Sequence, residues 1–294
     1  MNPLRISLMP PSSLSSNSQP REFGSDQLSP RPSAMKISVI LTTYNHERFI
    51  RQALDSILMQ KTTFNFDLII TEDCSTDSTR AILFEYQSRH PDQIRLILSE
   101  QNLNSNHVTG RAVEAARADY LAFLDGDDYW TSPDKLQRQA DFLDRHADCA
   151  LCFHAVALVD ASGSYIEGPW PTSPPLSLFP TIEDLIQSNF IPGCTALIRR
   201  SAIGALPSWF EEVPFGDWPL YLLAARSGRI GFIPETFGVY RRHAAGYWSS
   251  LTISQKCAST IACLEILEQN LGADLRDAFQ RSRQNWISRS LKHQ

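Results

Sequence analysis

The sequence predicts an α/β fold in which a mostly parallel sheet is flanked by helices. Short apolar runs rich in Ile, Leu, Val and Thr alternate with helical patterns between residues 36 and 145. Several of these runs end in polar residues, which is typical of strands whose carboxyl ends face a ligand site. The 294 residues are 43% hydrophobic and 20% charged, which is enough for a sizeable core.

The first half of the chain contains four expected strands. They are the runs Lys36–Tyr44, Phe66–Thr71, Ile94–Leu98 and Tyr120–Leu124. The helix after the first strand has an apolar stripe at helical spacing, formed by Ile50, Ala53, Leu54, Ile57 and Leu58. Two more helices are expected over Ser78–Arg89 and Val108–Arg117. Ser132 and Pro133 open a fourth helix, because Ser caps an N-terminus and Pro fits the first turn.

The pattern changes after the apolar run Cys149–Val159. Residues 161–180 contain five prolines and are expected to form a loop. Thr181–Asp184 resembles a capping box that opens a short helix, and another helix is expected near Trp218. Strands over Arg229–Tyr240 close the domain, and helices follow over 252–269 and 274–291. We therefore expect a disordered segment 1–34, a main domain 35–250 and a C-terminal helical extension 251–294.

Charge and composition exclude several classes of protein. The net charge of −5 provides no broad basic surface for nucleic acid. No run of about 18 apolar residues is present, so no transmembrane helix is predicted. Residues 1–34 are rich in Ser and Pro and lack the apolar centre of a secretory signal. We therefore expect a cytoplasmic protein.

One cysteine pattern invites a metal interpretation. Cys149 and Cys152 form a C-x-x-C, but no second pair stands at ligand spacing and the motif lies in an apolar run. Buried thiols are the better interpretation. His154, in the same run, is expected to be a core histidine.

The acidic cluster Asp125-Gly126-Asp127-Asp128 directly follows a predicted strand. Three carboxylates in four residues repel one another unless a cation or solvent compensates. Oxygen ligands suit Mg²⁺ or Mn²⁺, which bind through one or two carboxylates plus substrate phosphates. Spacing leaves two ligand pairs open, Asp125 with Asp127 or Asp127 with Asp128. An acidic turn that caps the next helix is the alternative.

Two other polar clusters, Thr43-Tyr44-Asn45 and Glu72-Asp73, also follow predicted strands. Ligands of open α/β sheets bind outside the carboxyl ends of the strands. One crevice is therefore expected to gather all three clusters. HAD-type phosphatases also use Asp-rich strand ends, but early in the chain, whereas this cluster lies in the middle.

A series of stretches in fixed order carries a family resemblance. They are ISVILTTYNHERFI, LIITEDCSTDST, LSEQNLN, YLAFLDGDDYWTSPDKLQRQ, PFGDWPLYLLAARSG and GVYRRHAAGYWS. This series resembles glycosyltransferase family 2, the inverting group with the GT-A fold. The form GDDYW-x-x-P-x-KL with a later GDWPL and YR-x-H resembles the branch that builds bacterial surface polysaccharides.

The resemblance implies roles at the donor site. Thr43, Tyr44 and Asp73 match positions that hold the nucleotide base. Asp125 takes the first place of a D-x-D motif, Asp127 matches a contact to ribose or metal, and Asp128 matches the metal-ligating carboxylate. Asn102 lies in a stretch that often flanks the nucleotide. The implied cofactor is Mn²⁺ or Mg²⁺, and the implied donor is a UDP or dTDP sugar.

The resemblance also implies a catalytic base and further ligands. Asp217 matches the carboxylate that takes the acceptor proton, and its alternative is a cap of the following helix. His243 matches a ligand of the metal or diphosphate, and Arg241 suits a diphosphate because arginine forks onto paired oxygens. Trp218, Tyr247 and Trp248 are candidates for the acceptor side, because aromatic faces suit sugar rings, and core packing is the alternative for Trp218.

The expected activity is sugar transfer from a nucleoside diphosphate to an acceptor hydroxyl in cell-surface polysaccharide synthesis. A lipid-linked or free glycan acceptor is implied, and a lipid-linked one would place the protein at the inner face of the membrane through peripheral contact. A nucleotidyltransferase would need a Gly-rich loop after the first strand, and a dehydrogenase a G-x-G-x-x-G, and neither is found. A catalytically inactive nucleotide-sugar-binding module on the same fold is the alternative from another class.

Overall fold

The computed structural model describes residues 35–171 and 177–292, which form one compact unit. The predicted disorder of residues 1–34 lies outside these ranges, as do residues 172–176 of the predicted loop.

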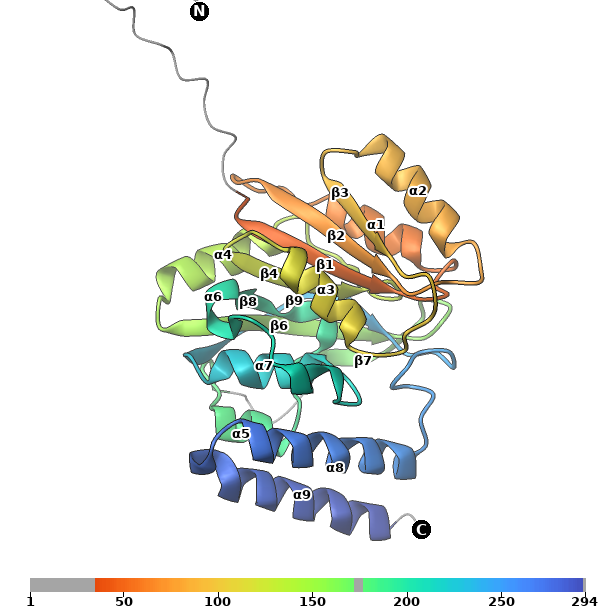
Figure 1. Ribbon diagram of the computed structural model, residues 1–294. Coiled ribbons are helices and arrows are strands. Elements are labelled where there is room, and N and C mark those ends of the chain that lie inside the picture. Colours follow the sequence, from red (N-terminus) through yellow and green to blue (C-terminus); the bar gives the residue numbers. More distant parts are fainter. Residues whose placement is uncertain (1–34, 172–176, 293–294) are drawn as a thin grey trace, which may run out of the picture. The chain divides into compact units, whose positions relative to one another are not determined.

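A single mixed sheet organises the protein. Its strands are β1 (Ile37–Thr43), β2 (Phe66–Glu72), β3 (Ile94–Leu98), β4 (Tyr120–Asp125), β5 (Tyr129–Trp130), β6 (Cys149–Val159), β7 (Tyr165–Trp170), β8 (Leu197–Arg199) and β9 (Arg229–Arg241). Among the described residues, the nine strands follow the order β3-β2-β1-β4-β8-β6-β9-β5, with β7 paired to β6 (Figure 1). Strands β3, β2, β1 and β4 are parallel, as are β6 and β9, and β8 runs antiparallel between β4 and β6. The predicted α/β class is confirmed.

Helices cover both faces of this sheet. They are α1 (Ile50–Leu58), α2 (Thr79–Arg89), α3 (His107–Ala115), α4 (Lys135–Arg145), α5 (Ile182–Gln187), α6 (Arg200–Ile203), α7 (Asp217–Ala225), α8 (Ile253–Asn270) and α9 (Arg276–Leu291). Short 3₁₀ turns lie at Gly193–Thr195, Ser208–Glu211 and Ala273–Leu275. The predicted capping box is present, since Thr181 accepts the Asp184 N–H and Asp184 accepts that of Thr181.

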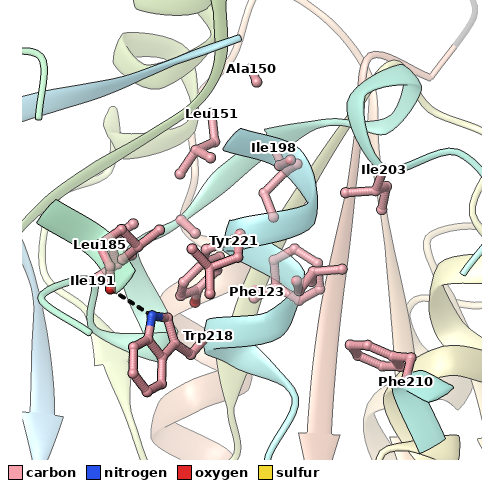
Figure 2. Close-up of a cluster of buried hydrophobic side chains, with 14 of the residues drawn as sticks. Phe123, Ala150, Leu151, Leu185, Ile191, Ile198, Ile203, Phe210, Trp218 and Tyr221 are labelled. Atoms are coloured by element: carbon pink, nitrogen blue, oxygen red, sulfur yellow. Dashed lines mark hydrogen bonds between the residues drawn. The ribbon is translucent and has the colours of Figure 1, made fainter. Parts of the chain in front are cut away.

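The alternation of side chains along β1 divides the core in two. Val39 and Leu41 pack with α1, α2 and α4, whereas Ile40 belongs to the cluster with α3 and α7. This second cluster, shown in part in Figure 2, also contains Leu264 of α8 and Phe279 of α9. Helices α8 and α9 lie side by side near α5 and α7 (Figure 1) and so share a core with the sheet. The division at residue 250 stays a sequence-based prediction.

The predicted loop 161–180 is wrong in its first part. Asp160 accepts the backbone N–H groups of Ser162 and Ser164, and this tight turn reverses the chain. The segment that follows pairs with β6 as β7, which is an outer strand where proline is tolerated. The loop was predicted because this segment is rich in proline.

Two smaller expectations have mixed outcomes. Cys149 and Cys152 are buried and unbridged in β6, as expected. His154 is fully buried, but only Nδ1 has a partner, the carbonyl of Ala155, and Nε2 has none among the described residues. No helix in the described ranges is long and apolar enough to cross a bilayer.

Candidate functional site

The carboxyl ends of β1, β2 and β4 meet at one edge of the sheet. Thr43 is in register with Glu72, and Thr42 with Asp125. The three polar clusters therefore lie together, as the strand ends predicted. A cavity of about 1120 Å³ opens at this edge and is lined by residues from each cluster, together with Asp217.

The acidic turn at the end of β4 requires a glycine. The Gly126 N–H donates to the carbonyl of Thr42 at 2.9 Å. A Cβ at this position would lie 2.6 Å from both Nδ1 of His46 and Oγ1 of Thr43. Gly126 therefore allows the acidic turn to lie directly against the end of β1.

The three aspartates of the turn have different surroundings. Asp125 and Asp127 line the cavity, and Asp125 accepts a hydrogen bond from the Thr42 hydroxyl at 2.5 Å. Asp128 is only 2% exposed, is absent from the cavity wall, and accepts the backbone N–H of Arg241 at 2.8 Å. This position does not fit the assignment of Asp128 as the metal-ligating carboxylate.

The electrostatics of the turn separate the same three residues. Desolvation by the surrounding protein, and then the negative charge of Asp127, raise the pKa of Asp125 to about 7. The side chain is nevertheless exposed to solvent in the cavity. Burial, followed by the charges of Asp127 and Asp125, raises the pKa of Asp128 well above its usual range. Burial also acts to raise the pKa of Asp127, but the hydrogen bond from His243 and the nearby imidazoles outweigh it and lower this pKa. Asp127 is thus the carboxylate of the turn that most favours its charged form.

Two histidines converge on Asp127. Nε2 of His243 lies 2.9 Å from Oδ2 of Asp127, and Nε2 of His46 lies 3.8 Å from the same oxygen. Burial lowers the pKa of His46. His243 was predicted from the sequence, whereas His46 was not, although it stands directly after Thr43-Tyr44-Asn45. The signal was its position at the carboxyl end of a strand.

The described residues include no group of three or more His, Cys, Asp or Glu side chains arranged as a metal site. The cavity instead presents two neighbouring carboxylates, Asp125 and Asp127, beside His243. A hard cation bound here would complete its coordination with water and substrate oxygens, as Mg²⁺ and Mn²⁺ do at nucleotide sites. The donor set fits such a cation.

All three guanidinium nitrogens of Arg241 donate hydrogen bonds to protein oxygens. Its Nε donates to the carbonyl of Asp127 at 2.9 Å, Nη1 to that of Asp160 at 3.3 Å, and Nη2 to Gln52 Oε1 at 2.8 Å. The residue is 5% exposed. It braces the acidic turn, which does not fit the predicted role as a diphosphate ligand.

The predicted base-binding residues lie on the neighbouring wall. Tyr44 is 38% exposed and Asn102 is exposed, and both line the cavity. The Asp73 carboxylate accepts the backbone N–H groups of Leu103 and Asn104 at 2.9 and 3.0 Å. Asp73 therefore shapes the loop of Asn102 and also borders the cavity. Thr43 is buried, with its hydroxyl 3.2 Å from Nδ1 of His46.

Asp217 opens α7 and faces the cavity. Asp217 is the first residue of α7, after Gly216 at the N-cap, and the backbone N–H of Trp218 stabilises its carboxylate. Its Oδ2 accepts a hydrogen bond from Asn189 Nδ2 at 3.0 Å, and Asn189 also lines the cavity. Burial raises the pKa of Asp217, which makes it a better proton acceptor. Asn189 could not be predicted as a site residue, because no recognisable motif surrounds it in the sequence.

Trp218 belongs to the core. Its Nε1 donates to the carbonyl of Leu185 at 2.8 Å, as the dashed line in Figure 2 shows, and the side chain is 2% exposed. The residue borders the cavity, but a side chain that is this deeply buried offers little ring surface to a sugar. The prediction that Trp218 binds substrate does not fit, and core packing holds. The half-buried aromatic residues of the wall are Trp170, Phe215, Tyr240, Trp248 and Trp286.

Several known proteins are similar to this chain in sequence. The chain is 38% identical over 218 residues to an uncharacterised protein of Mycobacterium tuberculosis, covering 73% of this chain and 61% of that protein. It is 32% identical over 170 residues to the putative teichuronic acid biosynthesis glycosyltransferase TuaG of Bacillus subtilis, covering 58% of this chain and 64% of TuaG. The chain thus spans less than two thirds of the length of these relatives.

Solved structures agree on the fold. The crystal structure of S. aureus TarS 1–349 in complex with UDP superposes with a TM-score of 0.62 at 21% identity, covering 88% of this chain and 72% of that one. The mannosyltransferase PcManGT from Pyrobaculum calidifontis, in complex with GDP-Man and Mn²⁺, gives 0.60 at 16% identity, covering 90% and 76%. Residues 38–206 match the model of glycosyl transferase family 2. This chain therefore belongs to glycosyl transferase family 2, with the GT-A fold.

Proposed function

We propose that this protein is a metal-dependent, inverting glycosyltransferase that moves a sugar from a nucleoside diphosphate to an acceptor hydroxyl in cell-surface polysaccharide synthesis. One observation carries the proposal: Asp125, Asp127 and Asp217 line one cavity at the carboxyl edge of the sheet. The first two suit a cation and its diphosphate, and the third suits a base.

We propose that the nucleotide-sugar donor lies along the carboxyl edge of the sheet. Tyr44 supplies a half-exposed ring for the base, while Asp73 and Asn102 supply polar groups beside it. The complexes of TarS with UDP and of PcManGT with GDP-Man support a nucleoside diphosphate as the ligand class. The base itself, of the UDP or dTDP type, is part of the proposal.

Asp125 and Asp127, with His243 beside Asp127, would hold Mn²⁺ or Mg²⁺ together with water and substrate oxygens, and the Mn²⁺ in PcManGT supports a divalent cation as the cofactor. When bound, such an ion stabilises the negative charge that develops on the leaving diphosphate. Within the chain, Arg241 and Gly126 hold the turn in place, and His46 packs against it. Asp128 fixes the turn to β9 rather than serving as a ligand.

Asp217 acts as the base. In a direct displacement, the acceptor oxygen bonds to the anomeric carbon as the bond from that carbon to the diphosphate oxygen breaks, and the acceptor proton passes to Asp217. Asn189 orients the carboxylate by donating to Oδ2, and the acceptor hydroxyl would approach the side of the carboxylate that borders the cavity. One displacement inverts the configuration, and no covalent sugar intermediate forms.

The acceptor is proposed to be a growing glycan, free or lipid-linked. The support is the kinship with TuaG, named as a teichuronic acid biosynthesis glycosyltransferase. A binding module without activity would keep the cavity but not the turnover.

The test is to screen UDP, dTDP and GDP sugars for thermal stabilisation with and without Mn²⁺, and then to measure hydrolysis of the labelled sugar that stabilises most. A ligand specific to the native state raises the midpoint of unfolding. We expect stabilisation that requires Mn²⁺, together with slow release of free sugar. Binding without release would support the module, and no binding of any nucleotide sugar would refute the donor site.

A further inference from the structure

The cavity is large for one ligand. Its volume of about 1120 Å³ exceeds the 300–1,000 Å³ that is usual for a single small-molecule site. One part of the wall is the polar sheet edge described above. The other comes from Phe215, the segment after β9, and helices α8 and α9, which contribute Lys256 and Trp286.

Lys256 differs from the other cations of the wall. Arg241 donates to three protein oxygens through its guanidinium, and Arg242 pairs with Glu167 at 3.3 Å. Within the described part of the chain, the side chain of Lys256 makes no hydrogen bond or ion pair, and its Nζ lies 5.9 Å from the centre of the Trp248 ring. A half-buried ammonium group without a carboxylate partner is therefore available to a ligand.

Contacts of Trp248 and of its neighbour Tyr247 hold the indole ring in place. Phe215 meets it edge-on, with ring centroids 5.4 Å apart at 73°. The neighbouring Tyr247 donates its hydroxyl to the carbonyl of Pro214 at 2.7 Å, which ties the segment after β9 to the start of α7. A half-buried indole and a free ammonium group thus stand next to each other on the wall that also contains Asp217.

We infer that Phe215, Trp248, Lys256 and Trp286 form an acceptor subsite for a sugar that carries an anionic group, a carboxylate or a phosphate. The inference rests on the proposed function, because Asp217 defines the acceptor side. The sugar ring would contact Trp248, and its anion would be paired by Lys256 in a charge-assisted hydrogen bond. An anion is favoured over a neutral sugar because it would compensate this unpaired charge.

The test uses three small probes: methyl glucuronide, glucose 6-phosphate and methyl glucoside. Each is titrated into ¹⁵N-labelled protein, and the indole N–H signal of Trp248, assigned with Trp248→Phe, is followed. We expect the two anionic probes to bind about tenfold more tightly than the glucoside, which is the scale of one charge-assisted contact. The comparison of glucuronide with phosphate identifies the anion.

Lys256→Gln should remove this preference, so that the two anionic probes bind no more tightly than the glucoside. Lys61→Gln, at an exposed lysine outside the cavity, is the matched control and should behave as wild type. Equal affinities for all three probes, or a preference that survives Lys256→Gln, would overturn the subsite. UDP with Mn²⁺ is titrated in parallel. If it fails to bind while the Lys256-dependent preference persists, the proposed donor site is wrong and the anion subsite stands.

Discussion

The two sides of the cavity are built in different ways. The proposed donor side, formed by Thr43–His46, Asp73 and Asp125–Asp127, is held by hydrogen bonds that side chains make with one another and with backbone groups. The acceptor side, formed by Phe215, Tyr247, Trp248, Lys256 and Trp286, is held mainly by ring contacts, with one hydrogen bond from Tyr247. Hydrogen bonds fix direction as well as distance, whereas ring contacts tolerate shifts. We therefore expect a donor side with strict geometry and an acceptor side that adapts to its ligand.

The largest effect is expected where the two sides meet, at Asp217. Asp217→Asn removes the proton acceptor but keeps the hydrogen bond from Asn189 through the amide oxygen. We expect the transfer rate to fall by about 10³-fold, within the range of general base catalysis. The affinity for UDP with Mn²⁺ should stay within about threefold, because the donor side is unchanged.

The wild-type rate should also decrease toward acid pH, since protonation of Asp217 removes the base and burial raises its pKa. Single-turnover kinetics across pH would show this limb, and the Asn variant should lack it. A variant that keeps near-normal transfer would move the base to another residue.

The protein also contains a buried lysine whose ammonium group lacks a hydrogen-bond partner among the described residues. Lys135 of α4 is fully buried, its Nζ lies 3.7 Å from the centre of the Trp130 ring, and it has no hydrogen-bond partner among the described residues. Burial lowers its pKa to about 7 from 10.5. The folded state therefore binds fewer protons than the unfolded state between pH 7 and 10.5, and this group makes the protein more stable as pH rises through that window.

Lys135→Met should remove this pH dependence. The variant is expected to be more stable than wild type at pH 7, by up to roughly 4 kcal/mol from the linkage, with the difference shrinking toward pH 10. Urea unfolding at several pH values measures it. A variant that is less stable at pH 7, or a constant difference, would show that Lys135 stays charged and compensated.

A smaller effect is expected at the brace of the acidic turn. Arg241→Lys keeps the charge but loses the fork that contacts Asp127, Asp160 and Gln52. We expect about 2 kcal/mol of lost stability, measured by urea unfolding, and weaker binding of UDP with Mn²⁺. Arg242→Lys, at the exposed neighbour, is the matched control and should change stability by less than about 0.5 kcal/mol. Equal effects at the two positions would contradict the bracing role.

The same difference between the two sides explains what the sequence could predict. The donor side comes from residues that follow strands within a few positions, so the strand ends alone place Thr43, Asp73 and Asp125 together. The direction of each side chain was not predictable. Asp127 and Asp128 are adjacent, yet one faces the cavity and the other faces the backbone of β9.

Long-range packing accounts for most of the remaining errors. Asn189 reaches Asp217 from 28 positions away, and Lys256 and Trp286 meet the cavity only because α8 and α9 pack on the second core cluster. Trp218 follows the catalytic candidate in sequence, but the turn of α7 directs it to Leu185. No local pattern contains these contacts, because each is decided by how separate elements pack.

The most direct test compares Asp127→Asn with Asp128→Asn by calorimetric titration of Mn²⁺ in the presence of saturating UDP. The account predicts that Asp127→Asn weakens Mn²⁺ binding by about 100-fold, since a ligand charge is lost. Asp128→Asn should change it by less than about threefold, because an amide oxygen still accepts the Arg241 N–H. Loss of Mn²⁺ binding in Asp128→Asn with retention in Asp127→Asn would contradict the account of this site.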